Sequence, residues 1–250
     1  MTKRAGVLRW PSGHSGSPAM HEAAYAATGL EGWRYQLLPV PPHLLEETIR
    51  ALGGAGFVGA NVTMPHKEAA LRVATTATES ARAIGAANTL TFSDDGAIEA
   101  DNTDAPGFLA ALGRDPAGMR ATVLGAGGSA RAVVWALRER GADVEVWNRT
   151  PERARALAEE LGARAVGEPH DGELLVSCVP AGVAVPPGHW ETVVDLAYGH
   201  EETPLIRRAR EAGAQTVDGA EILVRQGALS FERWTGMPAP LEAMRMALAP

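Results

Sequence analysis

A six-residue glycine turn constrains the fold of this chain more than any other feature of the sequence. The turn, GAGGSA at residues 125–130, follows an apolar strand candidate and opens an apolar-periodic helix that runs to Arg138. There the first glycine allows a tight turn, the second lets a pyrophosphate approach the backbone, and the small Ala130 lets helix and strand pack closely. The alternative is that the glycines serve only the turn. We expect a dinucleotide site formed by Gly125, Ala126, Gly127, Gly128 and Ser129.

Residues 121–163 have the pattern of one βαβα unit, with the glycine turn between its first strand and first helix. Parallel strands joined in this way need a right-handed crossover, and further strand candidates follow at 173–178 and 192–197. The pattern predicts a Rossmann-like, doubly wound parallel sheet, and we assign residues 104–218 to this dinucleotide-binding domain.

The first hundred residues alternate short apolar strands with helical stretches, which is typical of α/β architecture. We expect strands at 5–10, 33–40, 59–64, 88–93 and 97–101, and helices at 18–28, 42–52 and 104–112. The turn SDDG at 93–96 predicts a hairpin between two of these strands. Helix candidates at 219–234 and 240–248 complete the chain. The expected fold is an α/β substrate-binding domain over residues 1–103, on which 219–250 packs back, followed by the dinucleotide domain.

The end of the second strand of the βαβα unit indicates which dinucleotide is bound. An NAD site usually has an acidic residue here, which binds the ribose 2′-hydroxyl. This chain has Asn148 and Arg149 instead, with Arg153 one helical turn further on. An arginine binds a 2′-phosphate by charge-assisted hydrogen bonds, whereas an acid would repel it. We therefore expect NADP; the alternative is a solvated arginine at a helix start.

One lysine stands out because the chain hardly uses lysine. Lys3 and Lys67 are the only two, against 21 arginines. Lys67 follows a strand candidate that Pro65 ends. An amine can exchange a proton in a protein and a guanidinium does not, so Lys67 is a candidate acid–base group.

Asparagine is also scarce, and its four positions fall in candidate site segments: Asn61, Asn88, Asn102 and Asn148. Side-chain amides both donate and accept hydrogen bonds, which suits a polyol ligand, although turn chemistry explains asparagine equally well. Asp104 precedes Ala105-Pro106 at a helix start. A capping role alone would explain it, and a catalytic role would require it to meet Lys67 in space.

Composition excludes several classes of protein. A net charge of −7 argues against a nucleic-acid or anionic-membrane partner. No apolar run approaches the roughly 18–20 residues of a membrane span, and the first residues contain no signal-peptide stretch. The single Cys178 cannot form an internal disulfide and fits a reducing cytoplasm. We expect no metal; the sequence does not set the oligomeric state, and a monomer or a homodimer is expected.

Segments in order along the chain resemble the motifs of the shikimate dehydrogenase family. They are HSGSP (14–18), NVTMPHK (61–67), GAANTL (85–90), NTDAPG (102–107), the glycine turn (125–129), NRTPER (148–153) and, near the end, DG (218–219) with LVRQ (223–226). Each segment is weak alone, but their common order along nearly the whole chain makes chance implausible.

The resemblance implies an enzyme: a cytoplasmic, NADP-dependent oxidoreductase that reversibly reduces 3-dehydroshikimate to shikimate in aromatic amino-acid (chorismate) biosynthesis. Lys67 and Asp104 would be the catalytic pair beside the reacting carbon. Hydride delivery to a ketone leaves an alkoxide that needs a proton, and the pair would act as a unit in that exchange.

The resemblance also implies binding roles. Ser15 and Ser17 would bind the substrate carboxylate through their hydroxyls. The ring hydroxyls would be held, and the pocket framed, by Asn61, Thr63, Asn88, Asp104, Tyr198 and Gln226. The adenosine phosphate would be bound by Asn148, Arg149, Thr150 and Arg153, and the nicotinamide side would be lined by Glu79, Leu196 and Gly219.

Some positions depart from the family pattern, and two rival functions stay open. Arg9-Trp10-Pro11 stands where G-N-P is common, and Ser177-Cys178-Val179 replaces N-A-T. We expect His66 to be an exposed helix-start residue and Cys178 to be a packed thiol. The rivals are a quinate/shikimate dehydrogenase with broader substrate and cofactor use, and a non-catalytic, ligand-sensing relative. The missing acid beside Asn148 argues against the first, and the intact Lys67 and Asp104 against the second.

Overall fold

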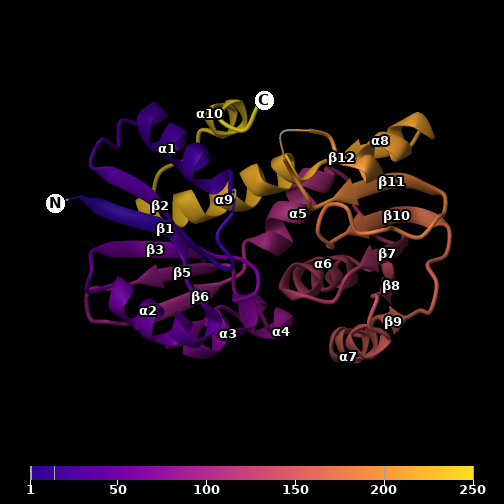
Figure 1. Ribbon diagram of the computed structural model, residues 1–250, viewed down its shortest axis with the longest axis horizontal. Coiled ribbons are helices and arrows are strands. Elements are labelled where there is room, and N and C mark those ends of the chain that lie inside the picture. Colours follow the sequence, from indigo (N-terminus) through magenta and orange to yellow (C-terminus); the bar gives the residue numbers. More distant parts are fainter. Residues whose placement is uncertain (1, 14, 200, 250) are drawn as a thin grey trace. The chain divides into compact units, whose positions relative to one another are not determined.

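The computed structural model describes residues 2–13, 15–199 and 201–249. The chain divides into two compact units (Figure 1). Unit 1 contains Met1–Thr103 and Leu223–Ala249, and unit 2 contains Asp104–Ile222. Within the described residues, no helix combines the length and the apolar character that a membrane crossing needs.

Unit 1 is built on a six-stranded mixed sheet. Its strands are β1 (Lys3–Arg9), β2 (Trp33–Pro39), β3 (Phe57–Val62), β4 (Thr76–Ala77), β5 (Thr89–Phe92) and β6 (Ile98–Asp101), in the spatial order β2-β1-β3-β5-β6-β4. Strand β1 runs parallel to β2 and β3, whereas β5 is antiparallel to β3 and β6. The predicted hairpin is present, because β5 and β6 pair through the turn at residues 93–96.

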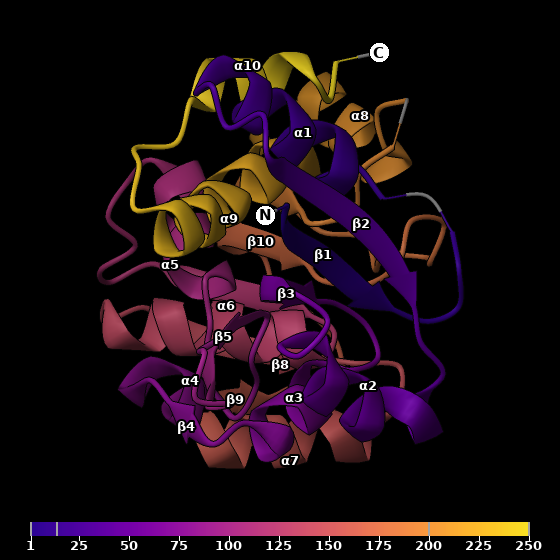
Figure 2. The ribbon, with the colours of Figure 1, turned by 90° about the vertical axis from the view of Figure 1, so that its left-hand side faces the viewer.

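Helices cover both faces of this sheet (Figure 2). They are α1 (Ser17–Ala27), the 3-10 helix η1 (Pro42–Leu44), α2 (Leu45–Leu52), α3 (Lys67–Val73), α4 (Glu79–Ile84), α9 (Gly219–Thr235, which starts in unit 2) and α10 (Leu241–Met246). Side chains alternate along a strand, so Val7 packs with α1, α9 and α10 while Leu8 packs with α2 and α3. Gly59 is required where α9 crosses β3, because a Cβ there would overlap the indole of Trp234.

Unit 2 is a parallel six-stranded sheet with helices, as the sequence predicts. Its strands are β7 (Arg120–Leu124), β8 (Asp143–Trp147), β9 (Arg164–Ala165), β10 (Gly172–Ser177), β11 (Trp190–Asp195) and β12 (Gln215–Val217). The spatial order β12-β11-β10-β7-β8-β9, with every pair parallel, is that of a Rossmann-like doubly wound sheet. The helices are α5 (Asp104–Leu112), α6 (Gly128–Glu139), α7 (Pro151–Leu161) and α8 (Pro204–Glu211).

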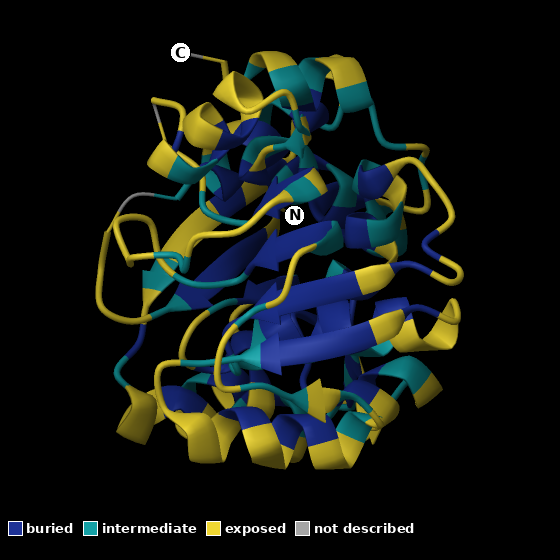
Figure 3. Ribbon diagram, turned by 90° about the vertical axis from the view of Figure 1, so that its right-hand side faces the viewer, coloured by how far each residue is buried: buried dark blue, intermediate teal, exposed yellow. Residues whose placement is uncertain are grey.

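The central strands of unit 2 are buried, whereas exposed residues lie on the outer turns of its helices and in its loops (Figure 3). On one face, Leu124, Leu175 and Val193 pack against Ile206 and Ala209 of α8. Because the strand order reverses between β7 and β10, the carboxyl ends of these two strands define the switch point at which such sheets bind ligands.

The structure differs from the sequence-based expectation mainly in short elements. The strand expected at 59–64 is β3 and ends at Val62, so Thr63 lies in the following turn. Helix α4, helix α8 and the strands β4, β9 and β12 were not expected. These elements have at most eight residues, which is too short for hydrophobic periodicity to show them clearly.

Candidate active site

Lys67 is the first residue of α3 and is buried, with 9% of its surface exposed. A turn carries the chain from β3 to this helix, in which the His66 N–H donates to the Thr63 carbonyl oxygen at 2.9 Å. The Ala87 N–H donates to the Lys67 carbonyl oxygen at 2.9 Å, which holds the helix start against the segment that leads into β5. Backbone contacts therefore position Lys67 at the end of a central strand.

The expectation that His66 is an exposed helix-start residue is wrong. His66 precedes α3 as expected, but only 1% of it is exposed, and its Nε2 lies 2.8 Å from the Val40 carbonyl oxygen. A carbonyl oxygen only accepts, so Nε2 carries the proton. Burial lowers the pKa of His66, although hydrogen bonds with the backbone of Val40 and Arg9 act in the opposite direction. His66 ties the turn before Lys67 to the chain that follows β2.

Three of the expected substrate-binding residues come together inside unit 1. The Asn88 Nδ2 donates to the Gln226 Oε1 at 3.1 Å, although the two residues are 138 positions apart. The Asn61 Nδ2 donates to the Asn88 carbonyl oxygen at 3.2 Å. All three side chains are at most 8% exposed. Helix α9 thus brings a C-terminal amide against the strand ends that carry the two asparagines.

The expected carboxylate-binding serines lie at the start of α1. Ser17 is its first residue and is buried, and its N–H donates to the Ser15 Oγ at 3.3 Å. Thr63 is half-buried, and its N–H donates to the Leu8 carbonyl oxygen at 3.0 Å. His14, which belongs to the same family motif as the serines, lies outside the described residues.

Asp104 is the first residue of α5, and the segment before it is fixed by hydrogen bonds. The Asp101 Oδ1 accepts from the Asn102 N–H at 2.8 Å, and its Oδ2 accepts from Arg233 of α9 at 3.0 Å. The Thr103 N–H donates to the Asn88 Oδ1 at 2.7 Å. Asp104 begins unit 2 whereas Lys67 belongs to unit 1, so the contact between them stays a prediction.

The glycine turn has the geometry that a dinucleotide needs. Gly125 has φ +114°, and a Cβ there would lie 3.4 Å from Cys178, the residue after β10. A Cβ at Gly127 would meet no heavy atom of the described chain within 4 Å. Residues 126–129 are partly exposed directly after a buried strand, and no side chain caps α6 at Gly127. The backbone at the switch point is therefore open to an anion, and the residues fit a pyrophosphate.

The loop after β8 presents cations to solvent. The Asn148 Nδ2 donates to the Thr150 carbonyl oxygen at 3.0 Å, which shapes the loop, and Arg149, Thr150 and Arg153 are exposed. No ion pair within the described ranges holds Arg149 or Arg153. These two arginines can therefore bind a phosphate without first breaking a salt bridge.

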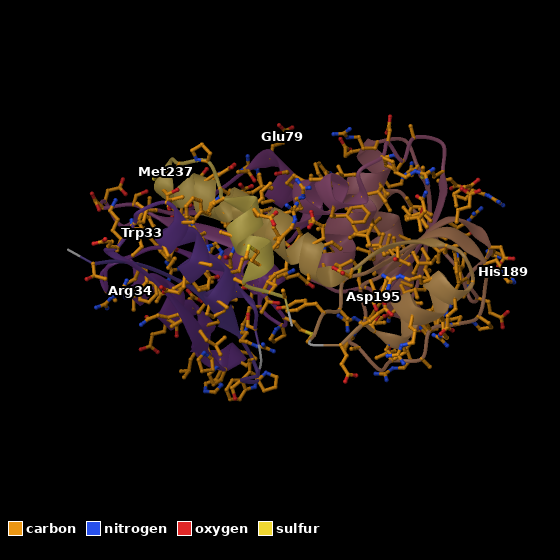
Figure 4. The ribbon with its side chains drawn as sticks, turned by 90° about the horizontal axis from the view of Figure 1, so that it is seen from above. Trp33, Arg34, Glu79, His189, Asp195 and Met237 are labelled. Atoms are coloured by element: carbon orange, nitrogen blue, oxygen red, sulfur yellow. The ribbon has the colours of Figure 1, made fainter. Side chains whose placement is uncertain are left out.

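The remaining expected residues fall into two groups. Glu79 is the exposed first residue of α4 in unit 1, where its side chain projects away from the ribbon (Figure 4). In unit 2, a Cβ at Gly219 would lie 2.5 Å from the Leu196 carbonyl oxygen, so the close approach of these two segments requires glycine. Tyr198 follows Leu196 by two residues and is 36% exposed.

The buried Asp195, labelled in Figure 4, shapes the loop that carries Leu196 and Tyr198. The Asp195 Oδ2 accepts from the Thr203 hydroxyl at 2.7 Å, and its Oδ1 accepts from the Ala197 N–H at 3.2 Å. In the described part of the chain, no three His, Cys, Asp or Glu side chains are grouped so that they could hold a metal ion.

Sequence reasoning missed the hydroxyls that surround the two asparagines. Thr89, Thr103 and Ser230 are all at most 3% exposed and hydrogen-bonded to one another or to Asn61 and Asn88. The sequence contained one indication of Ser230: it follows Gln226 by four residues, so the two side chains lie on the same face of a helix.

Comparison with known proteins matches this chain to one family along most of its length. Residues 7–90 match the family described as shikimate dehydrogenase substrate binding domain, residues 111–170 the shikimate/quinate 5-dehydrogenase family, and residues 219–249 the shikimate 5′-dehydrogenase C-terminal domain.

Individual relatives agree with the family match. The shikimate dehydrogenase (NADP(+)) of Methanopyrus kandleri is 43% identical, covering 99% of this chain and 95% of its own. That of one Thermus thermophilus strain is 44% identical over 98% of both chains. The crystal structure of shikimate 5-dehydrogenase from another strain of Thermus thermophilus, in complex with NADP(H) and shikimate, is 40% identical with a TM-score of 0.89, covering 99% of this chain and 98% of that one. This chain therefore belongs to the shikimate dehydrogenase family.

Proposed function

We propose that this protein catalyses the reversible, NADPH-dependent reduction of 3-dehydroshikimate to shikimate, as a cytoplasmic step of aromatic amino-acid biosynthesis. One observation carries the proposal: the full-length similarity to a protein crystallised with NADP(H) and shikimate, at 40% identity. The residues that the proposed chemistry needs, Lys67 and Asp104 for the proton and an open glycine turn for the cofactor, are present in this chain.

In the proposed reaction, the substrate is held mainly by neutral polar groups. The hydroxyls of Ser15 and Ser17 bind the carboxylate, and the Asn88 and Gln226 amides, with Thr63 and Tyr198, bind the ring hydroxyls. Asn61 donates to the Asn88 carbonyl oxygen, so it frames the pocket by holding the Asn88 segment. Amides and hydroxyls donate and accept, so they can follow an oxygen that changes between carbonyl and hydroxyl.

Lys67 and Asp104 handle the proton. NADPH, when bound, supplies the hydride that converts the ketone to an alcohol. The Lys67 ammonium gives the forming alkoxide its proton, and the neutral amine takes it back in the oxidation direction. The Asp104 carboxylate orients the amine and accepts a hydrogen bond from a ring hydroxyl, so the two groups act as one unit.

The proposed cofactor site follows the open backbone of unit 2. Gly125 to Ser129 bind the pyrophosphate at the start of α6, and Asn148 to Arg153 bind the adenosine phosphate. Leu196 and Gly219, with Glu79, line the nicotinamide side. The exposed arginines after β8 favour NADP over NAD because a 2′-phosphate gives them a charged acceptor.

Arg149→Ala is expected to weaken the use of NADP selectively. A hydrogen bond to a charged group contributes about 1.5–3 kcal/mol, which corresponds to a loss of about 10–150-fold in kcat/KM for NADP. The value for NAD, which lacks the phosphate, should stay unchanged. Steady-state kinetics with both cofactors measure the ratio. Arg155→Ala is the matched control, because Arg155 is an exposed arginine on α7, the helix that follows the loop of Arg149, and it pairs with Glu152; equal effects of both substitutions would contradict the assignment.

Growth complementation tests the proposed pathway role. A bacterial strain that lacks its own shikimate dehydrogenase should grow without aromatic amino acids when it produces this protein. It should fail to grow when it produces the Lys67→Ala variant at the same level. Absence of growth with folded wild-type protein present would contradict the proposed function.

A further inference from the structure

A cluster of amides and hydroxyls lies in the interior of unit 1. We call it the hydroxyl–amide cluster; its members are Asn61, Asn88, Thr89, Thr103, Gln226 and Ser230. None is more than 8% exposed. Buried polar groups destabilise a protein unless their hydrogen bonds are satisfied. Arrangements of this cluster that leave a group without a partner are therefore strongly disfavoured.

The cluster fixes which way both asparagine amides point. The Thr103 N–H, which can only donate, lies 2.7 Å from the Asn88 Oδ1. The Asn88 Nδ2 therefore faces the other way, toward the Thr103 Oγ1 at 2.9 Å and the Gln226 Oε1 at 3.1 Å. The Tyr35 hydroxyl donates to the Asn61 Oδ1 at 2.8 Å, which turns the Asn61 Nδ2 toward the Asn88 carbonyl oxygen. Rotation of either amide would place two donors or two acceptors together.

Two hydroxyls connect these amides across three elements. The Asn61 Nδ2 donates to the Ser230 Oγ at 2.8 Å, and the Ser230 and Thr89 hydroxyl oxygens are 2.9 Å apart. The Thr89 hydroxyl lies 3.2 Å from the Asn88 Oδ1, to which it donates. Donation from Asn61 through Ser230 and Thr89 to Asn88 gives each of these four groups a partner, and the Ser230 hydroxyl also lies 3.3 Å from the Gln226 carbonyl oxygen. Helix α9 and strands β3 and β5 are linked through this chain.

We propose that Thr89 and Ser230 are positioning residues: their hydroxyls hold the Asn88 amide, and with it Gln226, in the orientation that binds the ring hydroxyls of the substrate. The inference rests on the proposed function, because it takes Asn88 and Gln226 as substrate contacts. Neither Thr89 nor Ser230 needs to touch the substrate. Without the hydroxyl at Thr89, Asn88 loses one of the partners that fix its amide. The amide must then be ordered when the substrate binds, and this cost lowers the affinity for the substrate.

Thr89→Val and Thr89→Ser form the test pair, because the first removes the hydroxyl while keeping the branched shape and the second keeps the hydroxyl. For Thr89→Val we expect kcat/KM for shikimate to fall about tenfold, the worth of one net hydrogen bond, with KM for NADP unchanged. Thr89→Ser should stay near wild type. Ser230→Ala, on a different element, should give the same selective loss. Thr122→Val, a buried strand threonine in unit 2, is the matched control and should change neither constant.

A readout independent of turnover accompanies the kinetics. The hydrogen-exchange protection of the Asn88 side-chain amide, followed by NMR, should fall in Thr89→Val and in Ser230→Ala but not in Thr89→Ser. Equal kinetics and equal amide protection in Thr89→Val, Thr89→Ser and wild type would overturn the positioning role alone. A wild-type protein that does not turn over shikimate would overturn the proposed function, and this inference with it.

Discussion

Lys67→Ala is expected to reduce the turnover of shikimate by about 10²–10⁴-fold, the usual contribution of a positioned acid–base group. The physical reason is that the alkoxide formed by hydride delivery needs a proton, and a methyl side chain has none to give. Shikimate binding should change far less, because hydroxyls and amides supply most of the proposed contacts. Turnover and the shikimate dissociation constant, measured separately on the same preparation, check both statements.

Two variants sharpen the interpretation of Lys67→Ala. Lys67→Arg keeps the positive charge but does not release its proton, so its turnover should stay far below that of wild type. Lys3→Ala makes the same substitution at the other lysine, which lies over the ring of Trp33 at the exposed start of β1, and should leave turnover unchanged. Near-normal turnover in Lys67→Ala or in Lys67→Arg would contradict the assignment of Lys67.

His21→Leu is expected to make the fold less sensitive to acid. His21 lies on α1, is fully buried, and stacks on the ring of Tyr35 with 4.3 Å between ring centroids. Neither of its ring nitrogens has a hydrogen-bond partner in the described chain, and burial lowers its pKa from 6.5 to about 3. The same burial raises the pKa of the neighbouring Tyr25, with Glu22 adding to the effect.

The direction of the pH effect follows from the lowered pKa. Between about pH 6.5 and pH 3 the unfolded chain binds a proton at position 21 and the folded chain does not. The free energy of unfolding therefore falls as the pH falls, by about 1.4 kcal/mol per pH unit in that window from this one group. From about pH 7 to about pH 5 the loss amounts to about 2 kcal/mol, and His21→Leu should abolish it.

Urea unfolding at the two pH values measures the difference. The wild type should lose about 2 kcal/mol more than His21→Leu between them, while other titrating groups affect both proteins equally. His43→Leu, the same substitution at an exposed histidine, should follow the wild-type curve. If the free energies of unfolding of the wild type and of His21→Leu change in parallel with pH, His21 does not take up a proton on unfolding, and the prediction is wrong.

Local patterns in the sequence predicted the central strands of unit 2 and its first two helices after the glycine turn, but not α8, β9 or β12. The glycine turn between a strand and a helix predicts that β7, α6 and β8 form one parallel βαβ unit, and β7 and β8 do pair in parallel. The turn residues SDDG likewise predicted the β5–β6 hairpin. In each case the residues that decide the structure are neighbours in the sequence.

The interior of unit 1 could not be predicted in the same way, because its contacts are long-range. The hydrogen bond between Asn61 and Ser230 joins residues 169 positions apart, and no local pattern indicates it. His66 has the sequence context of an exposed helix start, and only the approach of the Val40 carbonyl oxygen makes a buried position favourable for it. Asparagine in this chain looked like a ligand-binding residue, whereas Asn61 and Asn102 are largely used to hold the protein itself.

Initial rates of nicotinamide reduction, measured by absorbance with shikimate and quinate each paired with NADP and NAD, test the central claim most directly. The purified wild-type protein should turn over shikimate with NADP with the highest kcat/KM of the four pairs. NAD should be a poor cofactor, because Asn148 and Arg149 replace the acid that binds its ribose. A higher kcat/KM with quinate or with NAD, or no turnover in any pair, would contradict an NADP-dependent shikimate dehydrogenase.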